Sequence, residues 1–231
     1  SADSNIAWKI TLPGSGSSTP VVWDKSIVLT TTENGANLTL CLDRSGKEKW
    51  RCETGKAASG KHKKASGSNS SPITDGTHIY VYFKSGDLAC VDFNGKIVWQ
   101  LNVQEKYGED TLWWDLGTSP VLTKNHVVIA VMQTGPSYLL ALNKNTGTLA
   151  WQQDRNLDAP LEAAQSYSTP VVTTINNKES IVVLGADFVT AHDAKSGKEL
   201  WRIGTLNPNG EKYWRSIASP AISDGIILAP Y

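Results

Sequence analysis

The sequence predicts an all-β fold, a β-propeller of four-stranded antiparallel blades. Three observations lead to this prediction. A Ser/Thr-Pro pair returns every 48 to 52 residues, each unit ends on a Gly that lies four residues before a Trp, and no stretch shows helical periodicity. A period near 50 residues without helices is typical of whole sheets repeated around an axis, because helical solenoids carry amphipathic helices in every unit.

The landmarks of the repeat run along the whole chain. The Ser/Thr-Pro pairs end at Pro20, Pro72, Pro120, Pro170 and Pro220. The Gly/Trp pairs are Gly46/Trp50, Gly95/Trp99, Gly147/Trp151 and Gly197/Trp201, and Trp8 would be the Trp of a preceding unit. We expect a single propeller domain over residues 1–231, with blades at about 17–54, 69–103, 117–153 and 167–203 and partial strands at 5–12 and 216–231.

Each unit has four short strands in the same order. In the first unit the opening strand begins at the Pro landmark, a β-branched strand follows at 27–29, and a third strand occupies 40–43. An Asp or Asn then opens a tight turn whose Gly tolerates positive φ. The fourth strand carries Trp50, whose indole would fill the gap between diverging blades. The Pro starts the first strand, where a missing N–H does least harm.

The three cysteines form no disulfide framework or metal motif, because they are odd in number and lack a CxxC spacing. Cys41 and Cys90 occupy the repeat position of Ala141 and Ala191, which predicts small buried residues on the third strand. Cys52 begins a polar loop after the blade Trp, and we expect it to be accessible. A redox role for Cys52 is the lesser alternative.

Charge and hydropathy restrict the classes of partner. The chain has 22 Lys+Arg and 22 Asp+Glu, and this balance argues against general binding of nucleic acid or anionic membranes. No run of about 18 apolar residues predicts a transmembrane helix. The chain starts at Ser1 without a Met, so we expect a targeting segment to be either removed or not included.

These motifs resemble the PQQ-like, or quinoprotein alcohol dehydrogenase-like, propeller family. The resemblance covers the Ser-Pro strand, the Leu-x-Ala-Leu-Asp-like third strand and the Gly-x-x-x-Trp ending of every unit. It implies a ring of seven or eight blades, of which four complete units and two partial ones would be roughly half. The alternative is a five-bladed ring in which the two end segments share a blade.

The resemblance also bears on cofactors and activity. Quinoprotein dehydrogenases of the family carry a vicinal cysteine pair and a calcium site of Glu, Asn and Asp, and they usually have a c-type haem partner. This chain has no adjacent cysteines, no recognisable calcium set and no CxxCH. We therefore expect no cofactor and a non-catalytic scaffold. The alternative is a PQQ-dependent oxidoreductase or another enzyme with a site in the central channel. Only under this alternative do we expect PQQ with calcium as cofactors.

Long connections between blades are the candidate sites for function. They begin at about Arg51, Leu101 and Gln152, with a fourth after the last complete unit. The first contains a Lys61-His62-Lys63-Lys64 cluster, which is either a mobile solvated loop or a site for an anionic partner. The candidate ligand- or partner-binding residues on this long-loop face are Trp113, Trp114, Asp115, Arg155, Glu162, Tyr167, Tyr213, Trp214 and Arg215.

Two interpretations of the aromatic residues remain open. Trp113 and Trp114 could form a platform for a ligand, or they could cover the core between blades. The second interpretation gains weight because Trp214 recurs six residues before a Pro landmark, as Trp114 does. No catalytic set can be assigned, and His192 is expected to be a packed, hydrogen-bonded histidine.

The resemblance is nearest to the non-enzymatic bacterial PQQ-repeat propellers. These include the propeller lipoprotein of the outer-membrane β-barrel assembly machinery and the extracellular repeat domains of bacterial kinases. The resemblance implies a periplasmic or extracellular location. It also implies an unidentified protein or small ligand as the partner of the long-loop face.

Overall fold

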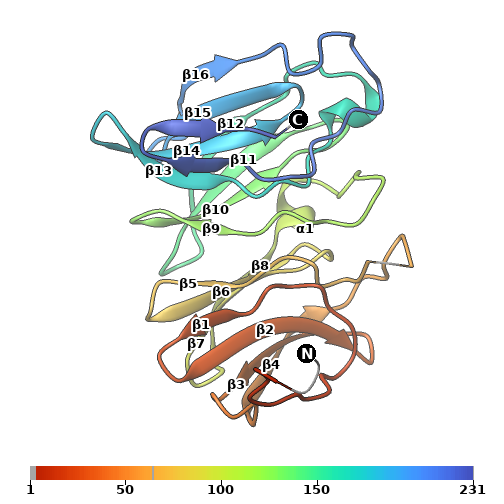
Figure 1. Cartoon of the computed structure of the whole chain (residues 1–231), viewed down its shortest axis with the longest axis vertical. Coiled ribbons are helices and arrows are strands. Elements are labelled where there is room, and N and C mark those ends of the chain that lie inside the picture. Colours follow the sequence, from red (N-terminus) through yellow and green to blue (C-terminus); the bar gives the residue numbers. More distant parts are fainter. Residues whose placement is uncertain (1–3, 64, 231) are drawn as a thin grey trace.

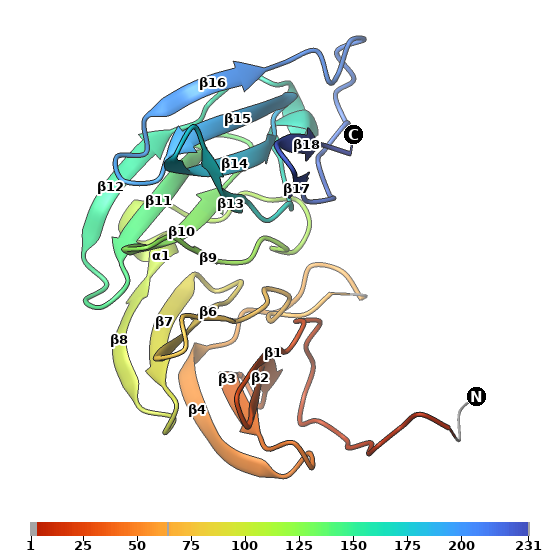
Figure 2. The same ribbon diagram turned by 60° about the vertical axis from the view of Figure 1, so that its left-hand side comes forward.

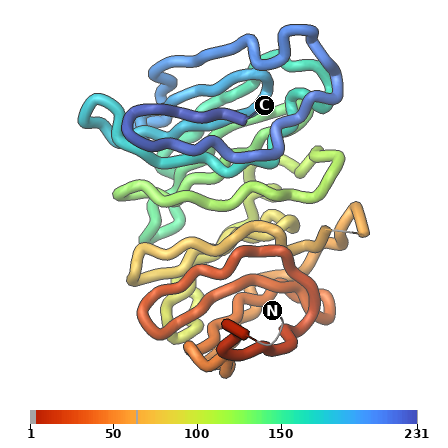
Figure 3. Tube along the Cα trace, in the orientation of Figure 1, coloured from red at the N-terminus to blue at the C-terminus, as the bar shows by residue number. Residues whose placement is uncertain are grey.

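The computed structural model describes residues 4–63 and 65–230. They form four four-stranded antiparallel sheets and one two-stranded sheet, which confirms the predicted all-β propeller fold. The four complete sheets follow one another along the molecule in chain order (Figure 1). The Cα trace completes one blade before it enters the next (Figure 3).

The complete blades share one strand order, in which each strand pairs with its neighbours in sequence. Blade 1 consists of β1 (Val21–Trp23), β2 (Ser26–Glu33), β3 (Ala36–Leu42) and β4 (Glu48–Lys56). Blade 2 consists of β5 (Ile73–Thr74), β6 (His78–Tyr82), β7 (Asp87–Asp92) and β8 (Ile97–Asn102). Figure 2 shows the fourth strands on the convex side of an arc of blades.

The second half of the chain repeats this arrangement. Blade 3 consists of β9 (Val121–Leu122), β10 (His126–Val131), β11 (Tyr138–Asn143) and β12 (Leu149–Asp154). Blade 4 consists of β13 (Val171–Ile175), β14 (Lys178–Gly185), β15 (Phe188–Asp193) and β16 (Glu199–Ile203). The two-stranded sheet pairs β17 (Ala221–Ser223) with β18 (Ile226–Leu228).

The hydrophobic core lies between neighbouring blades. One cluster joins Leu88 of blade 2 to Val127 and Leu140 of blade 3, and all three side chains are fully buried. Another joins Val128 of blade 3 to Ile181 of blade 4. Because the middle strands are covered on both faces, they are rich in apolar residues throughout, in place of the alternation of a half-exposed sheet.

A β-bulge recurs at the same position in all four complete blades. The register between the third and fourth strands shifts after a small residue: Cys41, Cys90, Ala141 and Ala191. That small residue pairs directly with the blade Trp of the fourth strand. A bulge redirects a side chain locally, and here it accompanies the indole that meets the next blade.

Three junction tryptophans, Trp50, Trp99 and Trp151, fasten each blade to the next. Their indole N–H groups donate to the residue after the Asp or Asn of the next tight turn: Phe93 O (2.9 Å), Lys144 O (2.8 Å) and Ala194 O (3.3 Å). The Gly of that turn lies against the indole ring. A Cβ at Gly95, Gly147 or Gly197 would come within 2.9, 2.7 or 2.4 Å of ring atoms, so a larger residue would not fit.

Trp8 makes the same contact with blade 1. The prediction of a strand at 5–12, however, is wrong. Trp8 Nε1 donates to Arg44 O at 2.6 Å, and its ring lies against Gly46. Residues 5–12 adopt no strand. A strand needs a hydrogen-bonded neighbour, and none of the described residues forms a sheet beside this segment. The side chain of Trp8 therefore makes the contact that its repeat position predicts, although its backbone forms no strand.

The cysteines are all buried, which makes the expected accessibility of Cys52 wrong. Strand β4 continues past Cys52 to Lys56, so the thiol packs between blades 1 and 2 with Val28 and Ile79. Burial raises the pKa of Cys52, which leaves it protonated and unreactive at neutral pH. Cys41 and Cys90 are completely buried, as their repeat position predicted.

The residue before each landmark Pro provides a second link between blades, which we call the hydroxyl relay. The backbone N–H of this residue donates to the hydroxyl of its counterpart in the next blade: Thr19 to Ser71 (2.9 Å), Ser71 to Ser119 (2.9 Å), Ser119 to Thr169 (3.0 Å) and Thr169 to Ser219 (2.8 Å). These bonds explain why the landmark carries Ser or Thr.

Candidate functional site

The long-loop face consists of the four connections between successive blades, at 57–72, 103–120, 155–170 and 204–220. They lie on the right-hand side of Figure 1. The first connection starts later than expected, because β4 is longer than the sequence indicated. Side-chain and backbone hydrogen bonds join each connection to the next.

Two of the connections contain short helices that the sequence did not predict. Helix α1 (Val103–Tyr107) is capped by Asn102, whose side chain accepts hydrogen bonds from the N–H groups of Gln104 and Glu105 at 3.0 Å each. The spacing of Asn102 and Glu105 resembles a capping box and was the signal available in the sequence. A 3₁₀ helix (Leu161–Ala164) follows Pro160 in the third connection.

Asp115 ties the first connection to the second. Its carboxylate accepts hydrogen bonds from the backbone N–H groups of Lys61 (2.8 and 2.9 Å) and His62 (3.1 Å), and it forms an ion pair with Lys84. Both side chains of this pair are buried. The structure therefore uses Asp115 internally, in place of the ligand contact expected from the sequence.

The surroundings of Asp115 keep it ionised. Burial by itself would raise the pKa of Asp115, but the Lys84 ammonium and the two backbone N–H groups outweigh it, so the pKa is lowered. Asp110 differs, because burial raises its pKa while the Lys61 ammonium lies 4.0 Å away. The Lys61-His62 part of the expected mobile loop is thus anchored, and Lys64 lies outside the described residues.

Trp114 lies at the centre of a second set of contacts. The Arg215 guanidinium is 5.5 Å from the centroid of the Trp114 ring, a cation–π distance, and it pairs with the buried carboxylate of Glu162. The His62 ring meets Trp114 edge-on, with ring centroids 5.6 Å apart. Three connections therefore meet at this indole. Glu162 and Arg215 neutralise one another, so neither offers an unpaired charge to a ligand.

Tyr167 and Gln165 fix the backbone of the tryptophan pair. Gln165 Oε1 accepts hydrogen bonds from the Trp113 N–H (3.2 Å) and the Tyr167 hydroxyl (2.9 Å). The Trp114 N–H donates to Tyr167 Oη at 3.3 Å. Burial raises the pKa of Tyr167 to about 12, so the hydroxyl keeps its proton at neutral pH. Sequence reasoning missed Gln165, because a lone Gln in a loop carries no motif.

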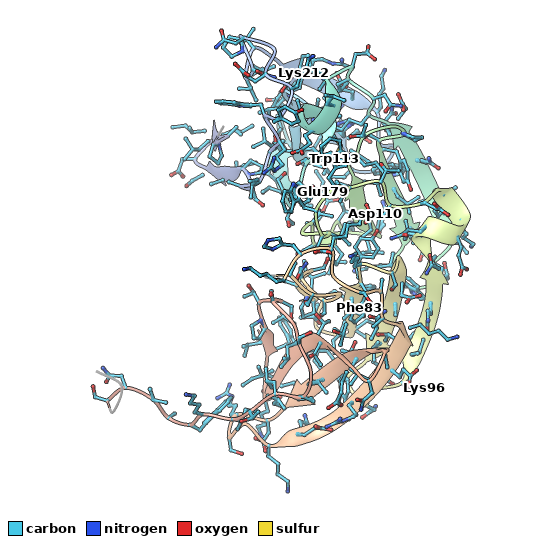
Figure 4. All side chains as sticks on the ribbon, turned by 90° about the vertical axis from the view of Figure 1, so that its right-hand side faces the viewer. Phe83, Lys96, Asp110, Trp113, Glu179 and Lys212 are labelled. Carbon is cyan, nitrogen blue, oxygen red and sulfur yellow. The ribbon has the colours of Figure 1, made fainter. Side chains whose placement is uncertain are left out.

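Four aromatic side chains remain exposed on this frame, and we call them the exposed aromatics. The exposed fractions are 50% for Trp113, 41% for Trp114, 64% for Tyr213 and 46% for Trp214. The exposed aromatics come from the second and fourth connections. The fourth connection is joined to the third by a hydrogen bond from the Ala163 N–H to Lys212 O at 3.1 Å. Along the long axis of the molecule, Trp113 lies between Asp110 and Lys212 (Figure 4).

Arg155 is not part of this surface. Its side chain is 1% exposed, and the guanidinium donates to Thr190 Oγ1 (2.9 Å) and Gly185 O (3.1 Å) of the β14–β15 hairpin. Burial lowers the pKa of Arg155. The structure therefore gives Arg155 an internal role, holding the end of blade 3 to blade 4, in place of the expected ligand contact.

His192 is fully buried and hydrogen-bonded, as predicted. Its Nδ1 lies 3.0 Å from Gly197 O and its Nε2 lies 2.9 Å from Thr190 Oγ1. Burial lowers the pKa of His192, which favours the neutral ring. These contacts make His192 a part of the core of blade 4.

Neither a candidate metal-binding cluster nor a pair of neighbouring cysteines is found among the described residues. Residues 4–63 and 65–230 contain no group of three or more His, Cys, Asp or Glu placed to hold a metal ion. The three cysteines are free and buried in separate strands, so no vicinal pair exists. Within the same residues, no helix is long and apolar enough to cross a membrane.

Comparison with protein families gives a match over nearly the whole chain. A family model described as outer membrane protein assembly factor BamB matches residues 1–135 and, separately, residues 40–229. The two matches overlap, as expected for a repeat that can be aligned in more than one register. No match was found among curated proteins.

Solved structures with a similar fold include both enzymes and an assembly factor. Quinohemoprotein alcohol dehydrogenase ADHIIG from Pseudomonas putida HK5 is 17% identical with a TM-score of 0.62, and the alignment covers 95% of this chain and 39% of that one. BamB from Moraxella catarrhalis is 12% identical with a TM-score of 0.61, covering 92% and 57%. Quinohemoprotein alcohol dehydrogenase from Comamonas testosteroni is 14% identical with a TM-score of 0.61, covering 93% and 39%.

These likenesses concern the fold, because sequence identity is low in every case. The chain spans 39% to 57% of the length of these three proteins. Fold alone does not separate a scaffold from an enzyme, since one fold supports many functions. The residues of the long-loop face must therefore carry any functional argument.

Proposed function

The chain belongs to the family described as outer membrane protein assembly factor BamB, and on that premise we propose that it is a non-catalytic scaffold that binds a protein partner in the bacterial cell envelope. One observation carries the proposal, the presence of the exposed aromatics on the long-loop face. Aromatic side chains contribute much of the energy of protein–protein interfaces, because they bury large areas with few rotatable bonds.

The frame beneath the exposed aromatics supports this role. Asp115 holds the first connection to the second, Gln165 and Tyr167 hold the tryptophan pair, and Glu162 holds Arg215 of the fourth connection. Binding costs less conformational entropy when the contacting residues are already ordered. The long connections are thus suited to present a fixed surface to a partner.

The charges of the face favour a polypeptide with apolar side chains over a nucleic acid. Lys84 is paired with Asp115, and Arg215 is paired with Glu162. The chain as a whole carries 22 basic and 22 acidic residues. The four connections of the face contain seven basic and seven acidic residues, whereas binding to a phosphate backbone depends on an excess of positive charge.

Photocrosslinking in cells of the source organism tests the proposal. A photoreactive amino acid replaces Trp113 or Tyr213, and a matched control replaces Val98, which is 45% exposed on the fourth strand of blade 2. We expect the first two positions to yield the same crosslinked envelope protein, identified by mass spectrometry, and Val98 to yield none. Equal products from all three positions, or none from Trp113 and Tyr213, would reject the long-loop face as the binding surface.

The proposed location is tested separately from the binding surface. We expect the protein to fractionate with the periplasm or the outer membrane, in keeping with the family description. Immunodetection in separated fractions, with a cytoplasmic marker as control, measures this. Recovery with the cytoplasmic marker would contradict an envelope role whatever the crosslinking shows.

We also propose that function requires neither PQQ nor calcium. The alternative, a PQQ-dependent oxidoreductase, predicts that the purified protein with PQQ, calcium, an alcohol and a dye acceptor turns over substrate. We expect no change in the PQQ absorption spectrum and no dye reduction. A saturable spectral change together with turnover would establish the enzyme alternative.

A further inference from the structure

A small cavity is bounded by blades 2 and 3 and by the second connection. Its volume is about 20 Å³. Tyr82 of blade 2, Tyr138 of blade 3 and Thr118 of the second connection line it, together with apolar side chains such as Leu112 and Leu116. The cavity therefore lies directly beneath the segment that carries two of the exposed aromatics.

Two hydroxyl groups of the cavity wall are buried without a partner. Tyr138 is 3% exposed and Thr118 is 2% exposed. Neither Tyr138 Oη nor Thr118 Oγ1 forms a hydrogen bond with any atom of residues 4–63 or 65–230. Buried hydroxyls are satisfied in most folded proteins, either by another protein group or by ordered water. A group outside the described chain is therefore the expected partner of both.

The size and the lining of the cavity determine what can occupy it. A volume of about 10 to 15 Å³ is enough for one water molecule, which needs two to four polar partners. Pockets for organic ligands are much larger, at roughly 300 Å³ or more. Tyr138 and Thr118 each offer one O–H donor and an acceptor lone pair, and a water molecule can pair with either role.

From these observations we propose that the cavity is a hydration site, in which one water molecule bridges Tyr138 Oη and Thr118 Oγ1. The water joins blade 3 to the second connection. Thr118 is also joined to the first connection, because its carbonyl oxygen accepts a hydrogen bond from Ser70 Oγ at 2.6 Å. The water thus belongs to the frame that orders two of the connections. The site is independent of the proposed function, because it requires no binding partner.

The sign of the change in stability tests the proposal in Tyr138→Phe and in Thr118→Val. Each substitution removes one hydroxyl with little change in shape. A bound water loses one hydrogen bond in either variant, so we expect the unfolding equilibrium constant to rise about fivefold. Urea unfolding followed by circular dichroism measures it. A constant that stays the same or falls in both variants would overturn the proposal, because removing an unpaired buried hydroxyl costs nothing.

Thr39→Val is the matched control. Thr39 Oγ1 is also buried without a hydrogen-bond partner among the described residues, but it lies on β3 of blade 1 and does not line the cavity. We expect the unfolding constant of Thr39→Val to stay the same or to fall. A rise equal to that of Thr118→Val would attribute the loss to the substitution type, and it would count against the water.

The double variant Tyr138→Phe/Thr118→Val tests whether the two hydroxyls share one water. Because the water leaves once both partners are gone, we expect the unfolding constant to rise by less than the product of the two single effects. Single effects that multiply in full would contradict a shared water.

A crystal structure of the parent and of the double variant identifies the occupant. We expect one water within about 3 Å of both hydroxyl oxygens in the parent, and none in the double variant. Replacing sodium chloride by ammonium chloride at constant ionic strength should leave the stability of the parent unchanged. A parent crystal without this water, or a response to ammonium that the double variant abolishes, would overturn the proposal.

Discussion

The junction tryptophans and the tryptophans of the long-loop face are the same residue type in opposite settings. Trp151 is 9% exposed and its indole donates to the next blade, whereas Trp113 is 50% exposed and its hydrogen bond to Gln165 comes from the backbone N–H. The junction contacts repeat from blade to blade. The contacts on the long-loop face do not, since Trp114 alone has Arg215 stacked on it and His62 at its edge.

This difference shows that recurrence along a repeat does not by itself indicate burial. Trp114 and Trp214 share a repeat position, which favoured an architectural interpretation, yet they are 41% and 46% exposed. Recurrence at a junction comes with a partner that also recurs, the Gly of the next turn. On the long-loop face no such glycine repeats against the indoles, so much of their surface stays in contact with solvent.

The largest expected effect separates the two settings directly. We expect Trp151→Ala to lower the free energy of unfolding by about 3 to 5 kcal/mol, because a large buried ring and its hydrogen bond are lost. Trp113→Ala should change it by less than about 0.5 kcal/mol, as for most surface substitutions. Urea unfolding followed by circular dichroism measures both. Similar losses for the two variants would erase the distinction between the settings.

The ion pair under the long-loop face should have the next largest effect. We expect Lys84→Met to cost about 3 kcal/mol, because it leaves the Asp115 carboxylate buried without its cation. Amide hydrogen exchange in residues 57–63 should rise with it, since Asp115 anchors this segment. The double variant Lys84→Met/Asp115→Asn is the control and should recover part of the stability, because the uncompensated charge is removed while an amide oxygen can still accept from the N–H groups of Lys61 and His62. A single variant as stable as the parent would show that the pair does not order the face.

The hydroxyl relay should contribute less at each step. We expect Ser119→Ala to cost about 1 kcal/mol, because the N–H of Ser71 loses its acceptor. Thr19→Val is the matched control, since the Thr19 hydroxyl accepts no relay hydrogen bond from the described residues and its N–H still donates to Ser71. Thermal or urea unfolding compares the two. A loss in Thr19→Val equal to that in Ser119→Ala would refute the relay.

The smallest expected effect concerns the pH dependence of stability through His192. Burial lowers the pKa of His192 in the folded state, so the unfolded chain binds a proton more readily between that pKa and about 6.5. Stability should therefore fall as the pH drops below about 6.5. His192→Leu, which restores the residue type found at Leu142, should flatten this part of the profile. Unfolding midpoints of the parent and of His192→Leu are measured from pH 5 to 8. The same dependence of the midpoint on pH in both proteins would contradict a role for His192.

The sequence was sufficient for the features that repeat. The Gly/Trp spacing predicted the contact between blades, and the alignment of Cys41 and Cys90 with alanines predicted their burial. The expected strand at 5–12 failed because strand formation depends on a pairing partner as well as on residue type. The predicted accessibility of Cys52 was wrong because the sequence does not mark the end of β4 sharply. In the second half of this strand, exposed polar residues alternate with buried ones.

The candidate site was predictable only in part. The aromatic residues could be named, since two adjacent Trp in a long connection are unusual, and the structure leaves them exposed. The internal roles of Asp115 and Arg155 could not be deduced. Their partners Lys84 and Thr190 are 31 and 35 residues away in sequence, and no local pattern connects charges that the fold alone brings together.

The measurement that tests the central claim most directly compares binding with stability in one set of variants. The affinity for the crosslinked partner is measured for Trp113→Ala/Tyr213→Ala and for Trp99→Phe, together with the free energy of unfolding of each. We predict at least a tenfold loss of affinity in the first variant with unchanged stability, and the reverse in the second. Unchanged affinity in Trp113→Ala/Tyr213→Ala would contradict a binding role for the exposed aromatics. So would a loss of affinity that is in proportion to the loss of stability in both variants.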